Sequence, residues 1–283
     1  MNDQLSGQLD LGRLFDVSTA QGLVESLNLR GAATAHDENA ICATIGSLRF
    51  NDDELVSTAQ KSGPAAGFLS AWKSHGVNAV SQVRGAYALA IVDASRKSVF
   101  LAVDRFAVQT LCYCLDGQEL SFSDRADCVE GRGNELDAQA IFDYLFFHMI
   151  PAPRTIFRKV RRLPAGHGLL IDESGVREIR HWPLTFDEQH REPFPVARNT
   201  FRKLIRDSVV EEVSGHKRVG AFLSGGTDSS TVAGMLCEVT GAPAPSYSIG
   251  FEPEVYDEMG YARLAARHFG CEHHEYYVTP AAL

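Results

Sequence analysis

The sequence lacks any apolar run close to the ~20 residues that a membrane-spanning helix needs. It also lacks the basic and apolar leader of a secreted protein, since it starts Met1-Asn2-Asp3-Gln4-Leu5. Six cysteines are present, but no two of them form a Cys-x-x-Cys pair. These absences argue against a membrane protein and a disulfide-stapled domain, and they predict a cytoplasmic chain with buried thiols.

Positive charge is scarce as well. There are 27 Lys and Arg residues against 36 Asp and Glu, which gives a formal net charge of -9. A basic cluster at residues 154–162 is interrupted by apolar residues, so a solvated surface explains it better than an RNA site. No nucleic-acid partner is therefore expected.

The stretch most informative about chemistry is residues 219–230. An apolar run, 219–223, is followed by Ser224-Gly225-Gly226, and a helical pattern begins at Asp228. A strand, a glycine turn and a helix N-terminus in this order predict an anion site, because unpaired N–H groups and the helix dipole face the same point. The structural alternative is a serine- and glycine-rich turn before an ordinary helix.

Three common motifs do not fit this loop. Gly226 stands where a P-loop needs lysine, and the adjacent Gly225 and Gly226 break the dinucleotide pattern. Phe222 replaces the first glycine of a hydrolase elbow. The remaining pattern, Ser-Gly-Gly-x-Asp-Ser-Ser after a strand, resembles the pyrophosphate loop of ATP pyrophosphatases, which cleave ATP to AMP and pyrophosphate.

The downstream residues narrow this resemblance. Residues 246–251 alternate as a strand, residues 261–269 have one apolar helical face with Gly270 as a C-cap, and His273-His274-Glu275 reads as a strand. Together these segments resemble the synthetase half of asparagine synthetases. Because β-lactam synthetases and lasso-peptide cyclases share that half, the resemblance implies the reaction type better than the substrate.

The resemblance implies ATP and Mg²⁺ as cofactors and assigns a role to particular residues. The implied pyrophosphate ligands are Ser224, Gly225, Gly226, Asp228, Ser229 and Ser230. Asp228 is the implied Mg²⁺ ligand, and its structural alternative is stabilisation of the helix N-terminus. Leu223 and Ile249 match positions whose backbone meets adenine, and their structural alternative is strand core.

The amino-terminal half has a second resemblance. Residues 85–93 and 98–103 read as two strands around a turn, followed by Asp104-Arg105 and a strand at 120–123. This ladder, and the stretch from Pro151 to His167, resemble the glutaminase domain of the same synthetases. The resemblance implies a β-sandwich flanked by helices.

The glutaminase chemistry, however, is predicted to be lost. Family glutaminases use a cysteine at position 2, where this chain has Asn2. The first cysteine, Cys42, lies inside an apolar strand and has no free α-amino group beside its thiol. No catalytic residue is therefore identified in this half, and ammonia or a substrate amine is the expected nucleophile.

These patterns predict two domains in a chain of mixed α/β and α+β class. Residues 1–184 are expected to form a degenerate class II glutamine amidotransferase-like domain, and residues 185–283 the first part of a parallel-sheet PP-loop domain of the asparagine synthetase type. The proline-rich segment 183–195 is the expected linker. Helices are expected at 196–213 and at 137–148, the latter with Ala140, Ile141, Tyr144, Leu145 and His148 inward.

The PP-loop domain is expected to be incomplete at Leu283, because family members continue beyond this point. The principal functional prediction is an ATP-dependent amide-forming ligase of the asparagine synthase type, acting on a small-molecule or peptide carboxylate. The alternatives are a non-catalytic nucleotide-binding or scaffold subunit, a truncated product, and a specialised peptide or β-lactam-type cyclase. A second chain that completes the domain, or a homo-oligomer, is the expected partner.

Overall fold

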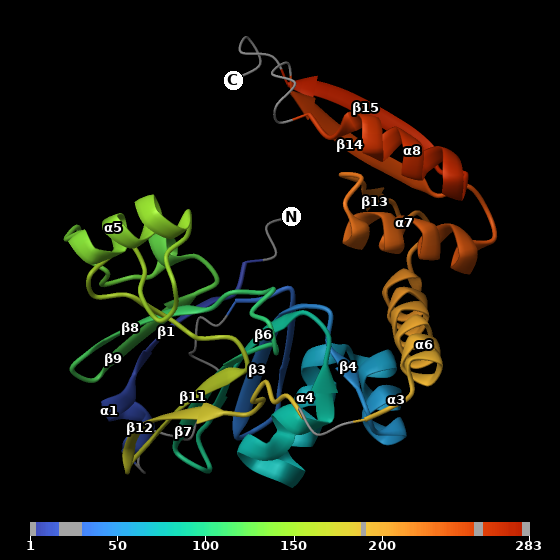
Figure 1. The fold of residues 1–283 in the computed structure, drawn as a ribbon. Helices are drawn as coiled ribbons and strands as arrows, with labels where there is room; N and C mark the ends of the chain where they lie inside the picture. The colour runs from blue at the N-terminus through green and yellow to red at the C-terminus, as the bar shows by residue number, and fades with distance from the viewer. Residues whose placement is uncertain (1–3, 17–29, 188–190, 252–256, 279–283) are drawn as a thin grey trace. The chain divides into compact units, whose positions relative to one another are not determined.

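The computed structural model describes residues 4–16, 30–187, 191–251 and 257–278. The chain divides into two compact units, Met1–Thr185 (unit 1) and Phe186–Leu283 (unit 2). Figure 1 shows their helices and strands. Each unit has its own hydrophobic core, so each is described by itself.

Unit 1 contains two antiparallel sheets. The smaller sheet has the order β1-β9-β8-β10, and the larger sheet has the order β12-β11-β7-β6-β3-β2. The smaller sheet comprises β1 (Ser6–Asp10), β8 (Cys112–Asp116), β9 (Glu119–Ser123) and β10 (Arg161–Arg162). The larger comprises β2 (Ala33–His36), β3 (Ala40–Gly46), β6 (Tyr87–Asp93), β7 (Ser98–Val103), β11 (His167–Asp172) and β12 (Gly175–Arg180).

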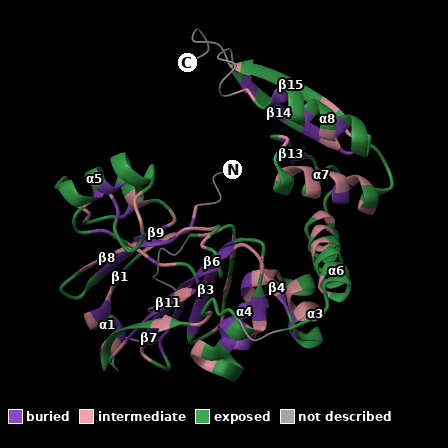
Figure 2. Cartoon of the chain, in the orientation of Figure 1, coloured by how far each residue is buried: buried purple, intermediate pink, exposed green. Residues whose placement is uncertain are grey.

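The sheets face each other across one core. Side chains from both, such as Leu9 and Leu120 from the smaller sheet and Ala90 and Leu101 from the larger, belong to a single buried cluster. Every residue of β6 and β7 is buried, and Figure 2 shows β3 and β6 in the buried colour. Strands that are covered on both faces read as continuous apolar runs, which explains the sequence of 87–93.

Helices cover the other face of the larger sheet. These are α3 (Asp53–Ser62) and α4 (Pro64–His75). The short strand β4 (Arg49–Phe50) precedes them, and the 3-10 helix η1 (Gly76–Gln82) and β5 (Val83–Arg84), the strand that pairs with β4, follow them. Trp72 of α4 stacks on Phe100, with ring centroids 5.4 Å apart, and its indole N–H donates to Asp93 at 2.8 Å. The predicted β-sandwich flanked by helices is confirmed.

The helix α5 (Ala138–Phe147) corrects one prediction. Ala140 is fully buried as expected, but Ile141, Tyr144 and His148 are exposed, and so is Leu145, at 71%. The other buried residue of this helix is the polar Asp143, and its carboxylate accepts a hydrogen bond from the Gln139 side chain at 2.7 Å. Periodicity could not select the buried side because this helix is apolar almost all round.

Unit 2 starts with the 20-residue helix α6 (Phe194–Val213). It continues with β13 (Ala221–Phe222), α7 (Thr227–Thr240), β14 (Pro245–Phe251), α8 (Met259–Phe269) and β15 (Glu272–Val278). The strands form a parallel sheet in the order β13-β14-β15. The strand expected over 219–223 is only two residues long. The strand expected at 246–251 is confirmed, and so is the C-cap at Gly270, which has φ +71°.

The two faces of this sheet differ. Side chains of α7 and α8, such as Leu236 and Ala262, pack with Ala221 and Leu223 in one buried cluster. On the other face, Phe222 and Ile249 remain exposed. No described residue of α6 is buried, and its side chains that pack against the cluster, Val209 and Val213, are only partly covered.

Nowhere in the described ranges is a helix long and apolar enough to cross a membrane.

Candidate nucleotide site

The Ser224–Ser230 segment lies where β13 ends and α7 begins. Phe222, the last residue of β13, pairs with Tyr247 of β14, so the loop leaves the sheet at the carboxyl end of its strands. In open α/β sheets this edge is where ligands bind. The strand–turn–helix order inferred from the sequence is therefore present.

Gly225 gives the loop its shape. Its φ is +84°, in the left-handed region, and a Cβ at this position would lie 2.5 Å from both the Ala262 nitrogen and the Tyr261 Cβ. A side chain is thus excluded by conformation and by the close approach of α8. Gly226 is different, because a Cβ there would meet only the Ser224 hydroxyl oxygen, at 3.4 Å.

Two hydroxyl groups hold the loop closed. The Oγ atoms of Ser224 and Ser229 lie 3.0 Å apart, and the Ser224 N–H donates to the Ser229 Oγ at 3.2 Å. The Gly226 N–H donates to the Ser224 Oγ at 3.3 Å. Both serine hydroxyls are therefore oriented toward the backbone of the loop.

The first turn of α7 supplies amide donors. Gly226 is the N-cap and makes no side-chain cap hydrogen bond. The N–H groups of Thr227, Asp228 and Ser229 have no intrahelical acceptor, because an α-helix leaves its first amides unpaired. With the positive end of the helix dipole, these groups form a cradle suited to an anion.

Asp228 is exposed in this first turn. The loop offers one carboxylate to a metal ion. In the described part of the chain, no three His, Cys, Asp or Glu residues are clustered as a metal site. A single carboxylate fits Mg²⁺ that takes its other ligands from phosphate oxygens and water. The loop therefore suits a metal that arrives with a nucleotide.

Leu223 is held by the neighbouring strand. Its N–H donates to the Tyr247 carbonyl at 2.8 Å, and its carbonyl accepts from the buried Ser248 hydroxyl. Its side chain is 1% exposed, in the core of unit 2. The contact with Ser248 cannot be predicted from the sequence, because it depends on the parallel register of β13 and β14.

Ile249 lies on the face of the sheet opposite α7 and α8. It pairs with Tyr276 and is 53% exposed. A cavity of about 470 Å³ opens on this face, lined by Phe222, Tyr247, Ser248, Ile249, His274, Glu275 and Tyr276. Phe222 is only two residues from Ser224, so this apolar cavity adjoins the loop.

The start of α8 also contacts the loop, which the sequence pattern did not predict. Tyr261 and Ala262 contact Gly225, and Arg263 one residue further ties α8 to β15. The Arg263 Nε donates to Glu275 at 2.8 Å, and this hydrogen bond holds the pKa of the Glu275 carboxyl below its usual range. The helix that confines Gly225 is thereby fixed to the sheet.

The adjacent histidines of β15 point to opposite faces, as expected for neighbours on a strand. The His273 Nδ1 lies 3.0 Å from the Ser246 Oγ, whereas the His274 ring stacks on Tyr247 with centroids 5.1 Å apart. A shared metal ion at this pair is therefore excluded.

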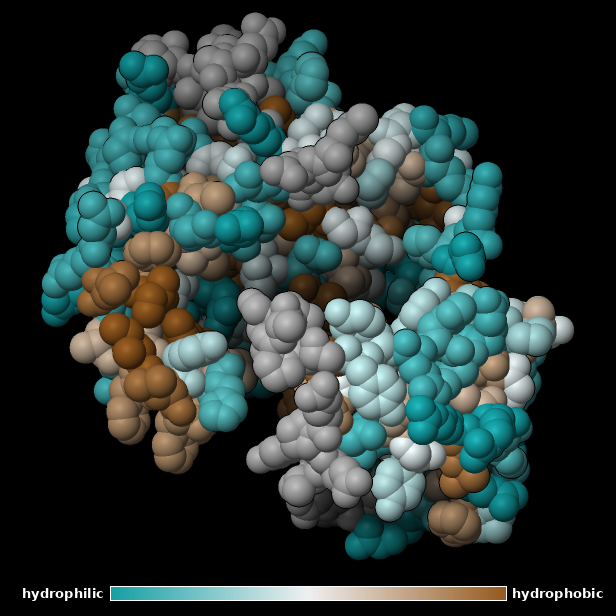
Figure 3. Space-filling view, turned by 90° about the horizontal axis from the view of Figure 1, so that it is seen from above, coloured by the Kyte–Doolittle hydropathy of each residue, from teal (hydrophilic) through white to brown (hydrophobic). Residues whose placement is uncertain are grey.

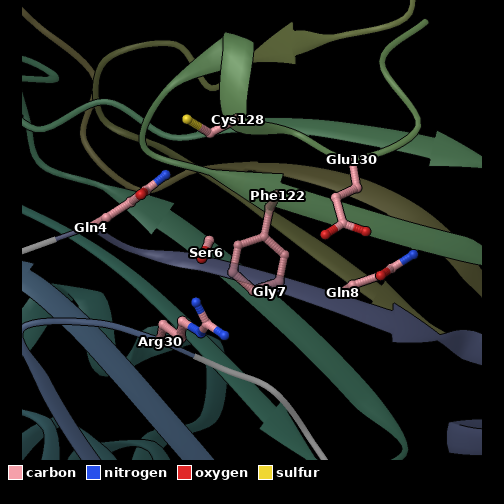
Figure 4. A pocket seen from close by; sticks show the side chains of 8 residues that line it. All are labelled: Gln4, Ser6, Gly7, Gln8, Arg30, Phe122, Cys128 and Glu130. Carbon is pink, nitrogen blue, oxygen red and sulfur yellow. The ribbon is translucent and has the colours of Figure 1, made fainter. Parts of the chain in front are cut away.

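Unit 1 has a polar cavity of about 250 Å³ beside β1 (Figure 4). It is lined by Gln4, Ser6, Gly7, Gln8, Arg30, Phe122, Cys128 and Glu130. The Gln4 amide donates to Ser123 at 3.1 Å, and the backbones of Ser6 and Arg30 exchange two hydrogen bonds. The only thiol in this lining, Cys128, belongs to the 3-10 helix η2 (Ala126–Cys128).

Neither Cys42 nor Cys128 can act as the amino-terminal nucleophile of a glutaminase. Cys42 is fully buried in β3, and burial raises the pKa of its thiol. Cys128 is exposed but internal to the chain, so it carries no free α-amino group. Asn2 lies outside the described residues.

Comparison with known proteins identifies both halves. The family model described as a glutamine amidotransferase domain matches residues 51–182, and the asparagine synthase model matches residues 200–283. A Methanocaldococcus jannaschii protein assigned as a glutamine-hydrolysing asparagine synthetase is 30% identical over 217 residues, which cover 74% of this chain and 42% of that protein. The chain belongs to the asparagine synthetase family.

Other asparagine synthetase family members agree. Glutamine-hydrolysing asparagine synthetase 1 of Bacillus subtilis is 26% identical over 218 residues, or 75% of this chain and 34% of that enzyme. The corresponding protein of Gallus gallus is 25% identical over 217 residues, with 69% and 35% covered. The chain thus spans well under half the length of these relatives.

Two solved structures are similar to the chain at low scores. An allosteric regulatory enzyme of purine biosynthesis has a TM-score of 0.36 at 13% identity, with 88% of this chain and 62% of that chain covered. A glutamine aminotransferase class-II domain protein of Silicibacter pomeroyi has a TM-score of 0.35 at 11% identity, with 64% and 92% covered. The family assignment depends on the sequence matches and not on these two structures.

Proposed function

We propose that this asparagine synthetase family chain binds ATP on the Ser224–Ser230 loop and takes part in the ATP-dependent formation of an amide. The observation that carries the proposal is Gly225, whose left-handed φ and close contact with α8 shape the loop before a helix N-terminus that has no side-chain cap. A tight turn of this kind brings backbone amides up to a phosphate.

Backbone amides and side-chain hydroxyls of the loop both bind the pyrophosphate part of ATP. The free amides of Thr227, Asp228 and Ser229 donate to phosphate oxygens. The hydroxyls of Ser224 and Ser229, now 3.0 Å apart, turn outward to donate to the ligand, and Ser230 in the same turn adds a further hydroxyl. Donors fixed before the reaction stabilise the charge that develops on the departing pyrophosphate.

Adenine is proposed to occupy the apolar cavity on the exposed face of the sheet. Ile249 lines this cavity, and Phe222 connects it to Leu223 and the loop. The aromatic rings of Tyr247 and Tyr276 in the same lining offer flat surfaces for a base. Asp228 would hold the Mg²⁺ that accompanies the nucleotide, and this ion would neutralise part of the phosphate charge.

The proposed reaction has two steps. The substrate carboxylate attacks the α-phosphorus of ATP, and pyrophosphate leaves from the loop. Ammonia or a substrate amine then attacks the acyl-adenylate, so that an amide forms and AMP leaves. Glutamine is not the proposed nitrogen source, because Cys42 is buried and Cys128 has no terminal amine.

The acid substrate is proposed to be a small molecule or a peptide, with aspartate as the first candidate. A second chain or another copy of this chain is the proposed partner, and the exposed apolar face of the unit 2 sheet supports it. A parallel sheet is normally covered on both faces, and the exposed Phe251, two residues after Ile249 on β14, extends this apolar face beyond the cavity proposed for adenine.

ATP–pyrophosphate exchange by the purified chain with Mg²⁺, with and without aspartate, tests the proposal. Asp228→Ala is expected to lower both exchange and ATP affinity at least tenfold, since it removes the only carboxylate of the loop. Glu238→Gln, an exposed change farther along the same helix, is the matched control and should leave both unchanged. Full activity of the Asp228→Ala protein would show that the loop is not the nucleotide site.

A second candidate function is nucleotide binding without turnover. It is favoured by the small acidic content of the loop, in which Asp228 is the single carboxylate between Ser224 and Ser230. ATP binding measured by calorimetry, together with no exchange for any carboxylate tested, would favour this candidate. Exchange that depends on aspartate would exclude it.

A further inference from the structure

Two cysteines that are 34 residues apart in sequence meet inside unit 2. The Sγ atoms of Cys237, in α7, and Cys271, directly before β15, lie 3.6 Å apart. Both residues are half-buried and pack against the apolar cluster between the sheet and its helices. Because a disulfide needs about 2.05 Å between sulfurs, a small side-chain movement is sufficient to join them.

We propose that Cys237 and Cys271 form an oxidative modification site that closes into a disulfide. The site needs no rearrangement of the fold, because both cysteines are already held by the backbone around them. The Cys271 N–H donates to the Ala266 carbonyl at 2.9 Å, and the Ala244 N–H donates to the Cys237 sulfur at 3.4 Å.

The two thiols differ in their surroundings, and this difference decides which of them an oxidant reaches first. Cys237 also lines a cavity of about 530 Å³ between α6, α7 and α8, which gives a small oxidant access to it. The pKa of Cys271 is raised to about 11, first by burial and then by the neighbouring Cys237, while a hydrogen bond with Ser246 acts in the opposite direction. The Ser246 hydroxyl is itself 3.0 Å from the His273 Nδ1.

Cys237 is therefore the thiol that reacts first with a peroxide. Its sulfur takes one oxygen from hydrogen peroxide, so that a sulfenic acid forms and water is released. The Cys271 sulfur then attacks the Cys237 sulfur, the S–O bond breaks, and the hydroxide leaves as water with the Cys271 proton. The two thiols lose two electrons and two protons in total, and one peroxide becomes two waters.

The disulfide is expected to stabilise unit 2 without altering the nucleotide loop. It would join α7 to β15 across a 34-residue separation, and such a link constrains the unfolded chain. The joined atoms lie near the carboxyl end of α7, whereas the Ser224–Ser230 loop lies at its amino end. We expect the unfolding temperature of unit 2 to rise by roughly 5 °C or more on oxidation.

The test is peptide mapping of the full chain after peroxide treatment continued until the exposed Cys128 is fully modified. Trypsin cuts after Arg218, Arg263 and Arg267, so the two cysteines fall in separate peptides beginning at Val219 and His268. The expected product is these two peptides joined, with a mass two hydrogens below their sum. The link should vanish on reduction and in Cys237→Ser and Cys271→Ser, and persist in the control Cys128→Ser.

Recovery of the two peptides unlinked from protein whose Cys128 is fully oxidised would overturn the proposal. So would a link that joins either peptide to Cys128. Because the wild-type map alone gives either answer, the test does not depend on the folding of the serine variants. The temperature shift with and without reductant, measured on wild type and Cys128→Ser, provides a second readout.

Discussion

At the scale of single residues, the adjacent glycines Gly225 and Gly226 have different structural roles. Gly225 adopts φ +84° with α8 packed against it, whereas Gly226 has an ordinary φ of -68° and caps α7. The sequence shows only that both are glycines. The structure distinguishes a position where no side chain fits from one where a methyl group is tolerated.

Gly225→Ala is therefore expected to destabilise unit 2 by at least about 2 kcal/mol, from the left-handed φ and from the contact with Ala262 and Tyr261. Gly226→Ala is expected to cost only about 1 kcal/mol, because a Cβ fits at this position and the loss is that of a poorer N-cap residue. Urea unfolding of both variants measures the difference. Equal losses would show that the loop has another conformation.

His181 gives the chain a pH dependence. It is half-buried, its Nε2 lies 3.0 Å from the Val103 carbonyl, and burial lowers its pKa below 6.5, with nearby His167 and Arg105 acting in the same direction. The unfolded chain therefore binds this proton more readily than the folded chain. Stability from this group is complete above the unfolded pKa of about 6.5 and declines as the pH falls toward the lower folded pKa.

Replacing this imidazole tests the assignment. We expect the free energy of unfolding of wild type to fall between pH 7.5 and pH 5.5, and His181→Gln to show a smaller fall. His75→Gln, which removes an exposed imidazole at the end of α4, is the control and should retain the wild-type slope. An unchanged slope in His181→Gln would mean that another group titrates.

At the scale of elements, α5 shows that a hydrophobic pattern can predict a helix without predicting which side of it is buried. The helix lies within the predicted range, but its exposed side carries most of its apolar residues: Ile141, Phe142, Tyr144, Leu145, Phe146 and Phe147. Figure 3 shows a hydrophobic patch on the part of unit 1 that carries this helix. A helix that is apolar almost all round does not reveal its buried side.

The two sides of α5 should respond oppositely to mutation. Leu145→Gln on the exposed side is expected to change stability by no more than about 0.5 kcal/mol. Ala140→Leu on the buried side is expected to cost about 1–3 kcal/mol, because Ala140 is fully buried and has no room for a larger side chain. Thermal unfolding distinguishes them, and a large loss for Leu145→Gln would place that side chain in a contact.

At the scale of the whole molecule, the chain consists of two units with separate cores. The division falls at Thr185–Phe186, one residue from the boundary expected from the proline-rich segment. Each unit matches a different family model, one for glutamine amidotransferase domains and one for asparagine synthase. The chemistry proposed for unit 2 therefore resides on a scaffold distinct from the sandwich of unit 1.

Limited proteolysis tests this organisation. A protease of broad specificity is expected to cut first between residues 183 and 193, because the described residues there are exposed and lie in no helix or strand. Mass spectrometry should identify two fragments, and a first cut within β6 or β7 would contradict separate cores. ATP with Mg²⁺ is expected to slow later cleavage of unit 2 only.

The sequence by itself determined the local features: the strand–turn–helix order around Ser224, the Gly270 C-cap, the sandwich strands and the family. These depend on glycine conformation, periodicity and motif spacing, which act between neighbouring residues. Only the tertiary structure decided that α8 confines Gly225, that Ser248 binds Leu223, and that Cys237 meets Cys271. Each of these contacts joins residues far apart in the chain, and it exists because the parallel register and helix packing bring them together.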